Sequence, residues 1–99
     1  MAERDIRKAL KKRVEAYGGE IRAVAWLGRS NAPDVLCLFS EDVVLGFGLP
    51  GTHPFIEAKA PDGEPTPAQL REHERMRAAG CNVIVISTIQ QLDDWLPPL

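Results

Sequence analysis

The sequence predicts an α/β domain in which a small mixed β-sheet is flanked by helices. Helical periodicity opens the chain, short apolar segments with strand character occupy its middle, and a strong helix start precedes the most apolar segment. The predicted order of elements is α-β-β-β-α-β-α. The chain has 99 residues, so residues 1–99 are expected to form one domain, near the lower end of sizes that bury a single core.

Residues 2–17 are predicted to form the first helix, which ends at a glycine pair. The apolar face of this helix consists of Ile6, Leu10, Val14 and Tyr17. This spacing predicts that the helix packs against the sheet along one side.

Glu3 has two open interpretations. Extending the apolar face back by one turn from Ile6 reaches Glu3, which places its carboxylate in line with the edge of the core. An acid in a first helical turn is also favoured by the helix dipole alone. Glu15 is rotated by about 100° from Val14 and is expected in solvent, but it is the alternative if another acid of this helix serves a site.

Five segments have the character of strands. Residues 20–27 alternate between two faces, and residues 34–39 are apolar after the first residue, which indicates burial on both faces. Residues 43–49 are interpreted as a third strand or a bent ribbon, because glycines interrupt their apolar run. Residues 55–61 and 82–87 complete the set. The last segment follows a helix, so it is expected to pair in parallel with an inner strand.

Two later helices are predicted to begin at threonine caps. Thr66, Pro67 and Gln69 combine an N-cap, a first-turn proline and the glutamine of a capping box. Thr88, with Gln91 three residues later, is predicted to cap a final short helix. These signals therefore mark the last long helix and the end of the fold.

Composition excludes several classes of protein. The formal net charge of −2 at pH 7 argues against a uniformly basic coat for nucleic acid. Cys37 and Cys81 are too few and too isolated for a zinc motif or a disulfide framework. No signal peptide or spanning apolar segment occurs, so a cytoplasmic location without membrane attachment is expected. The sequence contains no glycine-rich phosphate loop, so no organic cofactor is expected.

Neither histidine has an obvious chemical role in the sequence. His53 has no second histidine or cysteine near it and is interpreted as a loop residue. His73 lies one turn beyond Gln69 on the same helical face. No carboxylate is identified as its partner, so His73 is interpreted as a packed or substrate-facing residue.

The apolar segment 55–61 contains two opposite charges. Glu57 and Lys59 stand at alternate positions, so both are expected on one face of the strand. One interpretation is a solvated surface ion pair of little energetic weight. The other is a metal-binding carboxylate beside a lysine that orients or activates a water.

Other polar residues favour the metal interpretation, although each has a local explanation. Asp34 follows a proline at a strand start, where turn residues are common. If Glu3, Asp34 and Glu57 converge on one edge, three carboxylates would repel each other without a cation. Ligation by oxygen suits Mg²⁺ or Mn²⁺ rather than zinc. A hard cation beside Lys59 suits phosphodiester hydrolysis, because the metal polarises the phosphate and lowers the pKa of a water.

Three motifs in a fixed order carry a resemblance to a known family. They are Gly-Arg-Ser-Asn-Ala-Pro-Asp at 28–34, Ile-Glu-Ala-Lys-Ala-Pro at 56–61 and Pro-Ala-Gln-Leu-Arg-Glu-His at 67–73. Together with the early glycine pair and the segment 79–86, they resemble the virus-type replication-repair nuclease (VRR-NUC) domain of the PD-(D/E)xK superfamily. The resemblance extends over nearly the whole chain and implies a restriction-endonuclease-like core.

The resemblance also implies roles for individual residues. Lys59 is the implied catalytic lysine, and Gln69 is an implied accessory residue of the active site. The implied metal ligands are Glu3, Asp34, Glu57 and the backbone carbonyl of Ala58.

The resemblance is to standalone members of this family. It implies a homodimeric, structure-selective DNA endonuclease of DNA repair that acts on branched DNA such as Holliday junctions. Salt-sensitive phosphate contacts are expected from cationic side chains of both long helices and beside the site. These side chains are Lys8, Lys11, Lys12, Arg29, Arg71 and Arg75. A solvated helix face explains the same lysines without DNA. The alternative function is a non-catalytic DNA- or protein-binding module that retains the nuclease fold.

One departure from the expected family pattern concerns the connection between Phe39 and Phe55. It is longer and richer in glycine and proline than a compact hairpin. The role of residues 40–54, as dimer surface or substrate loop, is therefore left open, and so is the pairing of residues 43–49.

Overall fold

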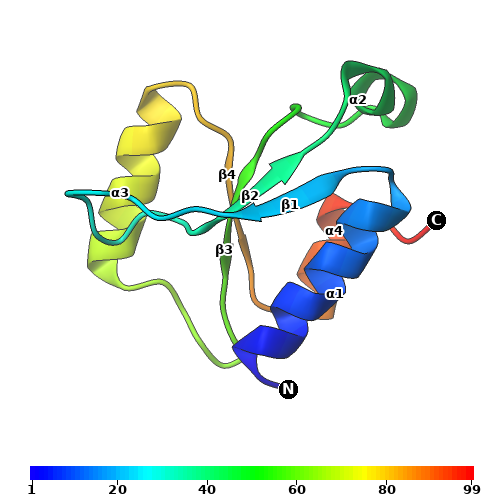
Figure 1. Ribbon diagram of the computed structural model, residues 1–99. Helices are drawn as coiled ribbons and strands as arrows, with labels where there is room; N and C mark the ends of the chain where they lie inside the picture. The colour runs from blue at the N-terminus through cyan, green and yellow to red at the C-terminus, as the bar shows by residue number, and fades with distance from the viewer.

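A four-stranded sheet lies at the centre of the computed structural model, which describes residues 1–99 (Figure 1). Its strands, in spatial order, are β1 (Glu20–Ala23), β2 (Val35–Leu38), β3 (Phe55–Ala58) and β4 (Val83–Ile86). The β1–β2 and β2–β3 pairs are antiparallel, whereas β3 and β4 are parallel. The predicted α/β class, the mixed sheet, the order of the predicted elements and the parallel pairing of the last strand are confirmed.

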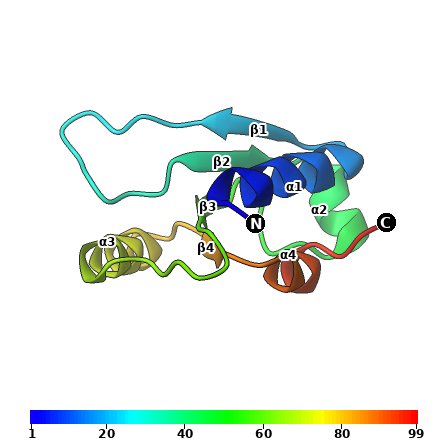
Figure 2. The ribbon, with the colours of Figure 1, turned by 90° about the horizontal axis from the view of Figure 1, so that it is seen from below.

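Helices cover both faces of this sheet. Helices α1 (Glu3–Ala16) and α4 (Ile89–Trp95) pack on one face, and α3 (Pro67–Ala78) packs on the other (Figures 1 and 2). The predicted apolar face of the first helix, α1, is buried against the sheet. The buried core comprises Ile6, Leu10, Val14, Tyr17, Val35, Cys37, Phe39, Ile56, Ala58, Ile86, Leu92 and Leu96. No helix has the length and apolar character needed to cross a membrane.

The prediction of a strand at 43–49 is wrong, because this segment belongs to helix α2 (Glu41–Phe47). The hydroxyl of Ser40 accepts a hydrogen bond from the Val43 amide at 3.2 Å and caps the helix. Gly48 ends it in the left-handed region, with φ of 66°. The ring of Phe47 packs edge-on against Tyr17 with centroids 4.8 Å apart, which joins α2 to the end of α1.

Both helices that were predicted from threonine caps are confirmed. The Thr66 hydroxyl accepts from the Gln69 amide at 3.1 Å, and the Thr88 hydroxyl accepts from the Gln91 amide at 3.1 Å. Helix α3 connects β3 to β4, as a parallel pair of strands requires. This crossover places α3 on the face of β3 that carries the charged residues.

The alternation of β3 divides its side chains between the two faces. Ile56 and Ala58 are fully buried in the core on the side of α1. Glu57 therefore faces α3, and the next position on that face is Lys59. A carboxylate at an interior strand position of this kind needs a specific partner.

Candidate active site

The register of β2 and β3 brings Asp34 and Glu57 close together. Val35 pairs with Ile56 in this antiparallel ladder. Extending the register by one residue sets Asp34 opposite Glu57, and opposed residues of antiparallel strands have Cβ atoms about 4.5–5.5 Å apart. Two carboxylates from distant parts of the sequence thus meet at one end of the sheet.

Glu57 is the most buried of the charged residues predicted for the site, with only 6 % of its surface exposed. His73 of α3 is fully buried, and its Nε2 lies 3.2 Å from Oε1 of Glu57. Because an ionised carboxylate only accepts hydrogen bonds, the imidazole Nε2–H is the donor. Burial raises the pKa of Glu57, and the nearby charge of Asp34 adds to this rise. The His73 hydrogen bond and the positive charge of Lys59 lower the pKa and partly offset it.

Lys59 continues the line of β3 beyond its last strand residue. Its backbone amide donates to the Ile86 carbonyl at 3.0 Å, so the alternation that relates Lys59 to Glu57 is preserved. The Glu57 carboxylate is paired with His73 rather than with Lys59. The half-buried lysine is therefore not consumed by a surface ion pair and has its ammonium available for another partner.

Arg7 links Glu3 to Asp34. Its Nε lies 3.1 Å from the Glu3 carboxylate, and its Nη2 lies 2.8 and 2.9 Å from the two Asp34 oxygens. The predicted convergence of three carboxylates is thus not formed, since no three acidic, histidine or cysteine side chains are grouped to hold a metal. Sequence reasoning missed Arg7, because its spacing from Glu3 is that of an ordinary ion pair along a helix.

The segment between β1 and β2, which carries Asp34, is anchored at two points. The indole N–H of Trp26 donates to the carbonyl of the proline before Asp34 at 2.8 Å. The Trp26 ring also packs on Phe55 of β3, with centroids 5.4 Å apart. Farther along, Arg29 makes two hydrogen bonds, of 2.9 and 2.5 Å, to Glu72 of α3. These anchors place Asp34 relative to β3, although no local sequence pattern indicated them.

Glu72 of α3 accepts hydrogen bonds from two arginines, Arg29 and Arg75. It is only 4 % exposed and accepts from Arg75 at 2.9 Å. Hydrogen bonding from Arg29, followed by that from Arg75, lowers the pKa of Glu72 to about 2. Two of the three arginines predicted to contact phosphate, Arg29 and Arg75, are therefore bonded to this carboxylate. Arg71 is exposed and forms no ion pair, as is true of Lys8, Lys11 and Lys12.

Gln69 and Ala58 are placed as the sequence suggested, and their site roles remain predictions. The Gln69 Oε1 accepts from the Thr66 amide at 2.9 Å, which completes the predicted capping box. Its carboxamide nitrogen makes no hydrogen bond within the protein and can donate to a ligand. The Ala58 side chain is buried in the core, while its carbonyl lies in the chain between Glu57 and Lys59.

The chemistry of these donors fits a small divalent cation. Mg²⁺ is commonly held by one or two carboxylates while it keeps several waters. Asp34 and Glu57 provide two such groups next to each other, and a cation between them would offset the like-charge repulsion that contributes to the raised pKa of Glu57. Asp34 is about half exposed, which leaves its side of the pair open to solvent and substrate.

Comparison with known proteins identifies the family. A solved structure described as a VRR_NUC domain superimposes with a TM-score of 0.76; it is 39 % identical, and the match covers 93 % of this chain and 90 % of that one. This chain belongs to the VRR-NUC nuclease family. A relative by sequence, "Putative nuclease p44" of Acyrthosiphon pisum secondary endosymbiont phage 1, is 37 % identical over 95 residues, which are 96 % of this chain and 91 % of that protein. No family model matches the sequence. Membership of the VRR-NUC family supports a nuclease function and, in general terms, the use of a divalent metal.

Proposed function

We propose that this VRR-NUC protein is a Mg²⁺- or Mn²⁺-dependent endonuclease that hydrolyses phosphodiester bonds in DNA. Its preferred substrates are branched DNAs such as Holliday junctions, and its active form is a homodimer. The observation that supports this function most is the position of Asp34 opposite the buried Glu57, with Lys59 on the same strand face. Two adjacent carboxylates suit a divalent cation, and an unpaired lysine beside them suits the charge that develops during phosphodiester hydrolysis.

Each side chain of this site has a distinct task in the proposed reaction. When bound, a divalent cation polarises the phosphate and lowers the pKa of a water. Asp34 and Glu57 are the carboxylates that would hold it, joined by the Ala58 carbonyl. His73 fixes the orientation of Glu57 through its 3.2 Å hydrogen bond. Lys59 donates from its ammonium to the attacking water or to the phosphate oxygens, where negative charge develops.

Glu3 and Gln69 are proposed to act at the edge of this site. Glu3 is tied to Asp34 through Arg7, so it supports the Asp34 carboxylate from helix α1. Gln69 has an unused carboxamide N–H for a phosphate oxygen. Neither residue takes over the role of Lys59 or of the two metal-binding carboxylates.

The surface of α1 supplies the proposed phosphate contacts. Lys8, Lys11 and Lys12 are exposed and unpaired, so their charges are available to DNA. Contacts of this type fix the position of the DNA without reading its sequence. The sequence contains no recognised motif for reading base edges in a groove, which is consistent with recognition of DNA shape.

The catalytic proposal is tested by cleavage of linear, flap and four-way junction DNAs with Mg²⁺ or Mn²⁺. Lys59→Ala and Asp34→Ala are each expected to lower the rate by about 10²–10³-fold or more, because the first removes a group that stabilises developing charge and the second a carboxylate that would hold the cation. Asp62→Ala, which removes an exposed acid just after β3, is the matched control and should cleave like the wild type.

Retained cleavage by either the Lys59→Ala or the Asp34→Ala variant would contradict the proposed mechanism. A wild-type protein that cuts none of these DNAs, but binds them, would instead support the non-catalytic binding module. Circular dichroism of each variant shows whether the fold is intact, so that loss of activity is not mistaken for unfolding.

A further inference from the structure

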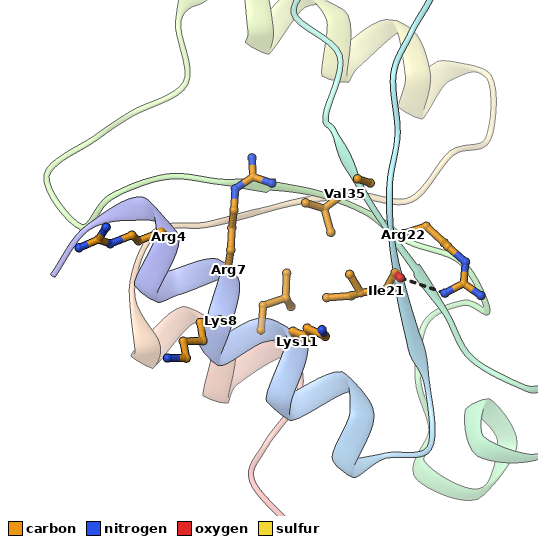
Figure 3. Close-up of a pocket in the computed structure, with 9 residues that line it drawn as sticks. Arg4, Arg7, Lys8, Lys11, Ile21, Arg22 and Val35 are labelled. Atoms are coloured by element: carbon orange, nitrogen blue, oxygen red, sulfur yellow. Dashed lines mark hydrogen bonds between the residues drawn. The ribbon is translucent and has the colours of Figure 1, made fainter.

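A hollow of about 350 Å³ lies between helix α1 and strand β1, at the edge of the sheet (Figure 3). Its floor is apolar and consists of Leu10 from the helix, Ile21 and Ala23 from β1, and Val35 from β2. Figure 3 shows Ile21 and Val35 pointing from the sheet toward α1. The volume of the hollow is near the lower end of the range for pockets that bind small organic groups.

All charged residues at the rim of the hollow are cationic. Its charged lining residues are Arg4, Arg7, Lys8, Lys11 and Arg22, and no carboxylate lines it. In Figure 3, Arg7 and Lys11 extend along the hollow, whereas Arg4 and Lys8 project from the outer side of α1. Three of the five form no ion pair, and the exposed pair of Arg22 with Glu20 is of the weak kind that solvent screens.

We propose that this hollow binds one unpaired nucleotide of the DNA substrate. The base would lie on the apolar floor, and its flanking phosphates would lie against the cationic rim. Paired bases inside a duplex are stacked and cannot reach such a floor, whereas a base that has left the stack exposes its face to a protein surface. A phosphate alone would explain the rim but not the apolar floor. This inference rests on the proposed function and adds to it the feature of DNA that the protein selects.

A second copy of this chain is a less suitable occupant. In a two-fold symmetric contact the same surface patch meets itself, which would bring the same cationic rim from both copies together. Like charges in such a contact repel each other and disfavour association. Nucleic acid supplies the opposite charge together with an aromatic, apolar face.

The hollow is directly connected to the candidate active site. Arg7 lines the hollow and also binds both oxygens of Asp34. Val35 of the floor follows Asp34 in the chain, and the two side chains lie on opposite faces at the same end of the sheet. A nucleotide held there would lie at the same end of the sheet as the phosphate to be cleaved and would be joined to the site through Arg7, so cleavage would be favoured where pairing is interrupted, as at a branch point.

The experiment uses the full chain with Lys59→Ala, which is expected to bind DNA without cutting it. The probes are a duplex containing a single unpaired 2-aminopurine and the same duplex with that base paired. Binding is measured by fluorescence anisotropy, and the environment of the base by 2-aminopurine emission. The test variant adds Ala23→Phe, which fills the floor from an exposed position; the matched control adds Ala25→Phe, two residues along the same chain segment and outside the hollow.

The expected result is a preference for the unpaired probe that Ala23→Phe reduces by about tenfold and Ala25→Phe leaves unchanged. Emission of the unpaired base should change on binding to the control protein but not to Ala23→Phe. Equal preference in both proteins, or equal loss in both, would overturn the inference. If Ala23→Phe does not fold, Ala23→Glu replaces it, because a carboxylate on the floor would repel the nucleotide.

Two further outcomes distinguish the nucleotide site from a dimer contact and from the proposed nuclease function. Loss of a dimer in sedimentation with Ala23→Phe, without loss of the preference, would assign the hollow to a second copy and overturn the nucleotide proposal. A persistent preference for the unpaired probe, together with a wild-type protein that cuts no DNA, would support the nucleotide site and contradict the proposed nuclease function.

Discussion

Helices α1 and α3 both carry several cationic side chains, but they use these charges in opposite ways. The exposed cations of α1 form no ion pairs and face solvent; they are Arg4, Lys8, Lys11 and Lys12. On α3, Arg75 and Arg77 lie 2.8 Å from Glu72 and Glu74, respectively. The number of charges on a helix therefore does not show how much positive potential it offers to DNA. We infer that α1 is the main DNA-contacting helix.

The role of α3 is internal support. Its buried His73 holds Glu57, and its buried Glu72 binds Arg29 in the segment that leads to Asp34. Both carboxylates of the candidate active site thus depend on α3, although neither belongs to it. The contrast with α1 separates two effects that mutations should distinguish, namely support of the site and attraction of the substrate.

Among the variants that distinguish support of the site from attraction of the substrate, the largest effect is expected at His73, the supporting residue closest to the site. His73→Leu removes the donor to Glu57 and should weaken Mn²⁺ binding by about 10–100-fold, as is typical when a residue that orients a metal ligand is lost. His73→Gln is the matched control, since its amide can still donate to the carboxylate. Isothermal titration with Mn²⁺ measures the affinities directly, and equal values for the leucine variant and the wild type would contradict this supporting role.

The second expected effect is on DNA binding and tests the two helices against each other. Lys8→Gln with Lys11→Gln removes two unpaired charges and should weaken binding to a four-way junction by about tenfold near 0.1 M salt. The slope of log K against log salt should become shallower by about 2. Arg75→Gln with Arg77→Gln removes the same formal charge from α3, where it is already neutralised, and should leave the slope nearly unchanged. Equal changes in slope for both pairs would remove the distinction between α1 and α3.

The smallest expected effect is on stability and depends on pH. Ion pairing in the folded state lowers the pKa of Glu72 to about 2 from the reference value of 4.5. The carboxylate therefore contributes stability that is present above about pH 4.5 and is lost as the pH falls toward 2. The free energy of unfolding of Glu72→Gln should be lower than that of the wild type at pH 7, and the difference should shrink over that range. A difference that is constant with pH would show that Glu72 acts through packing rather than charge.

Local sequence patterns predicted the elements whose boundary signals lie within a few residues. The capping box at Thr66 and the apolar face of α1 are formed as expected. The same reasoning failed at residues 43–49, because a short apolar run has no clear period and its two valines favour an extended interpretation. Ser40 and the two acids after it are a local helix-start signal, because a serine cap and first-turn carboxylates both favour a helix at this point.

The candidate site was predicted in its residue types but not in its pairing. Buried positions on α3 include Glu72 and His73 as well as Met76, and a polar pair on a buried helical face is the signal that could have identified both supports. Trp26 gave no such signal. Its hydrogen bond and its ring contact with Phe55 join segments whose proximity depends on the sheet.

The sequence by itself determined the ordered set of motifs, the strand face shared by Glu57 and Lys59, and the helix caps, because each depends on residues near one another in the chain. Only the tertiary structure decided which charges remain available. Arg7 meets Asp34 across 27 residues, and Arg29 meets Glu72 across 43. Electrostatic pairing depends on distance in space, and that distance is set by the register of β2 with β3 and by the position of α3 on the sheet. The same geometry leaves Lys8 and Lys11 of α1 exposed and unpaired beside the apolar hollow.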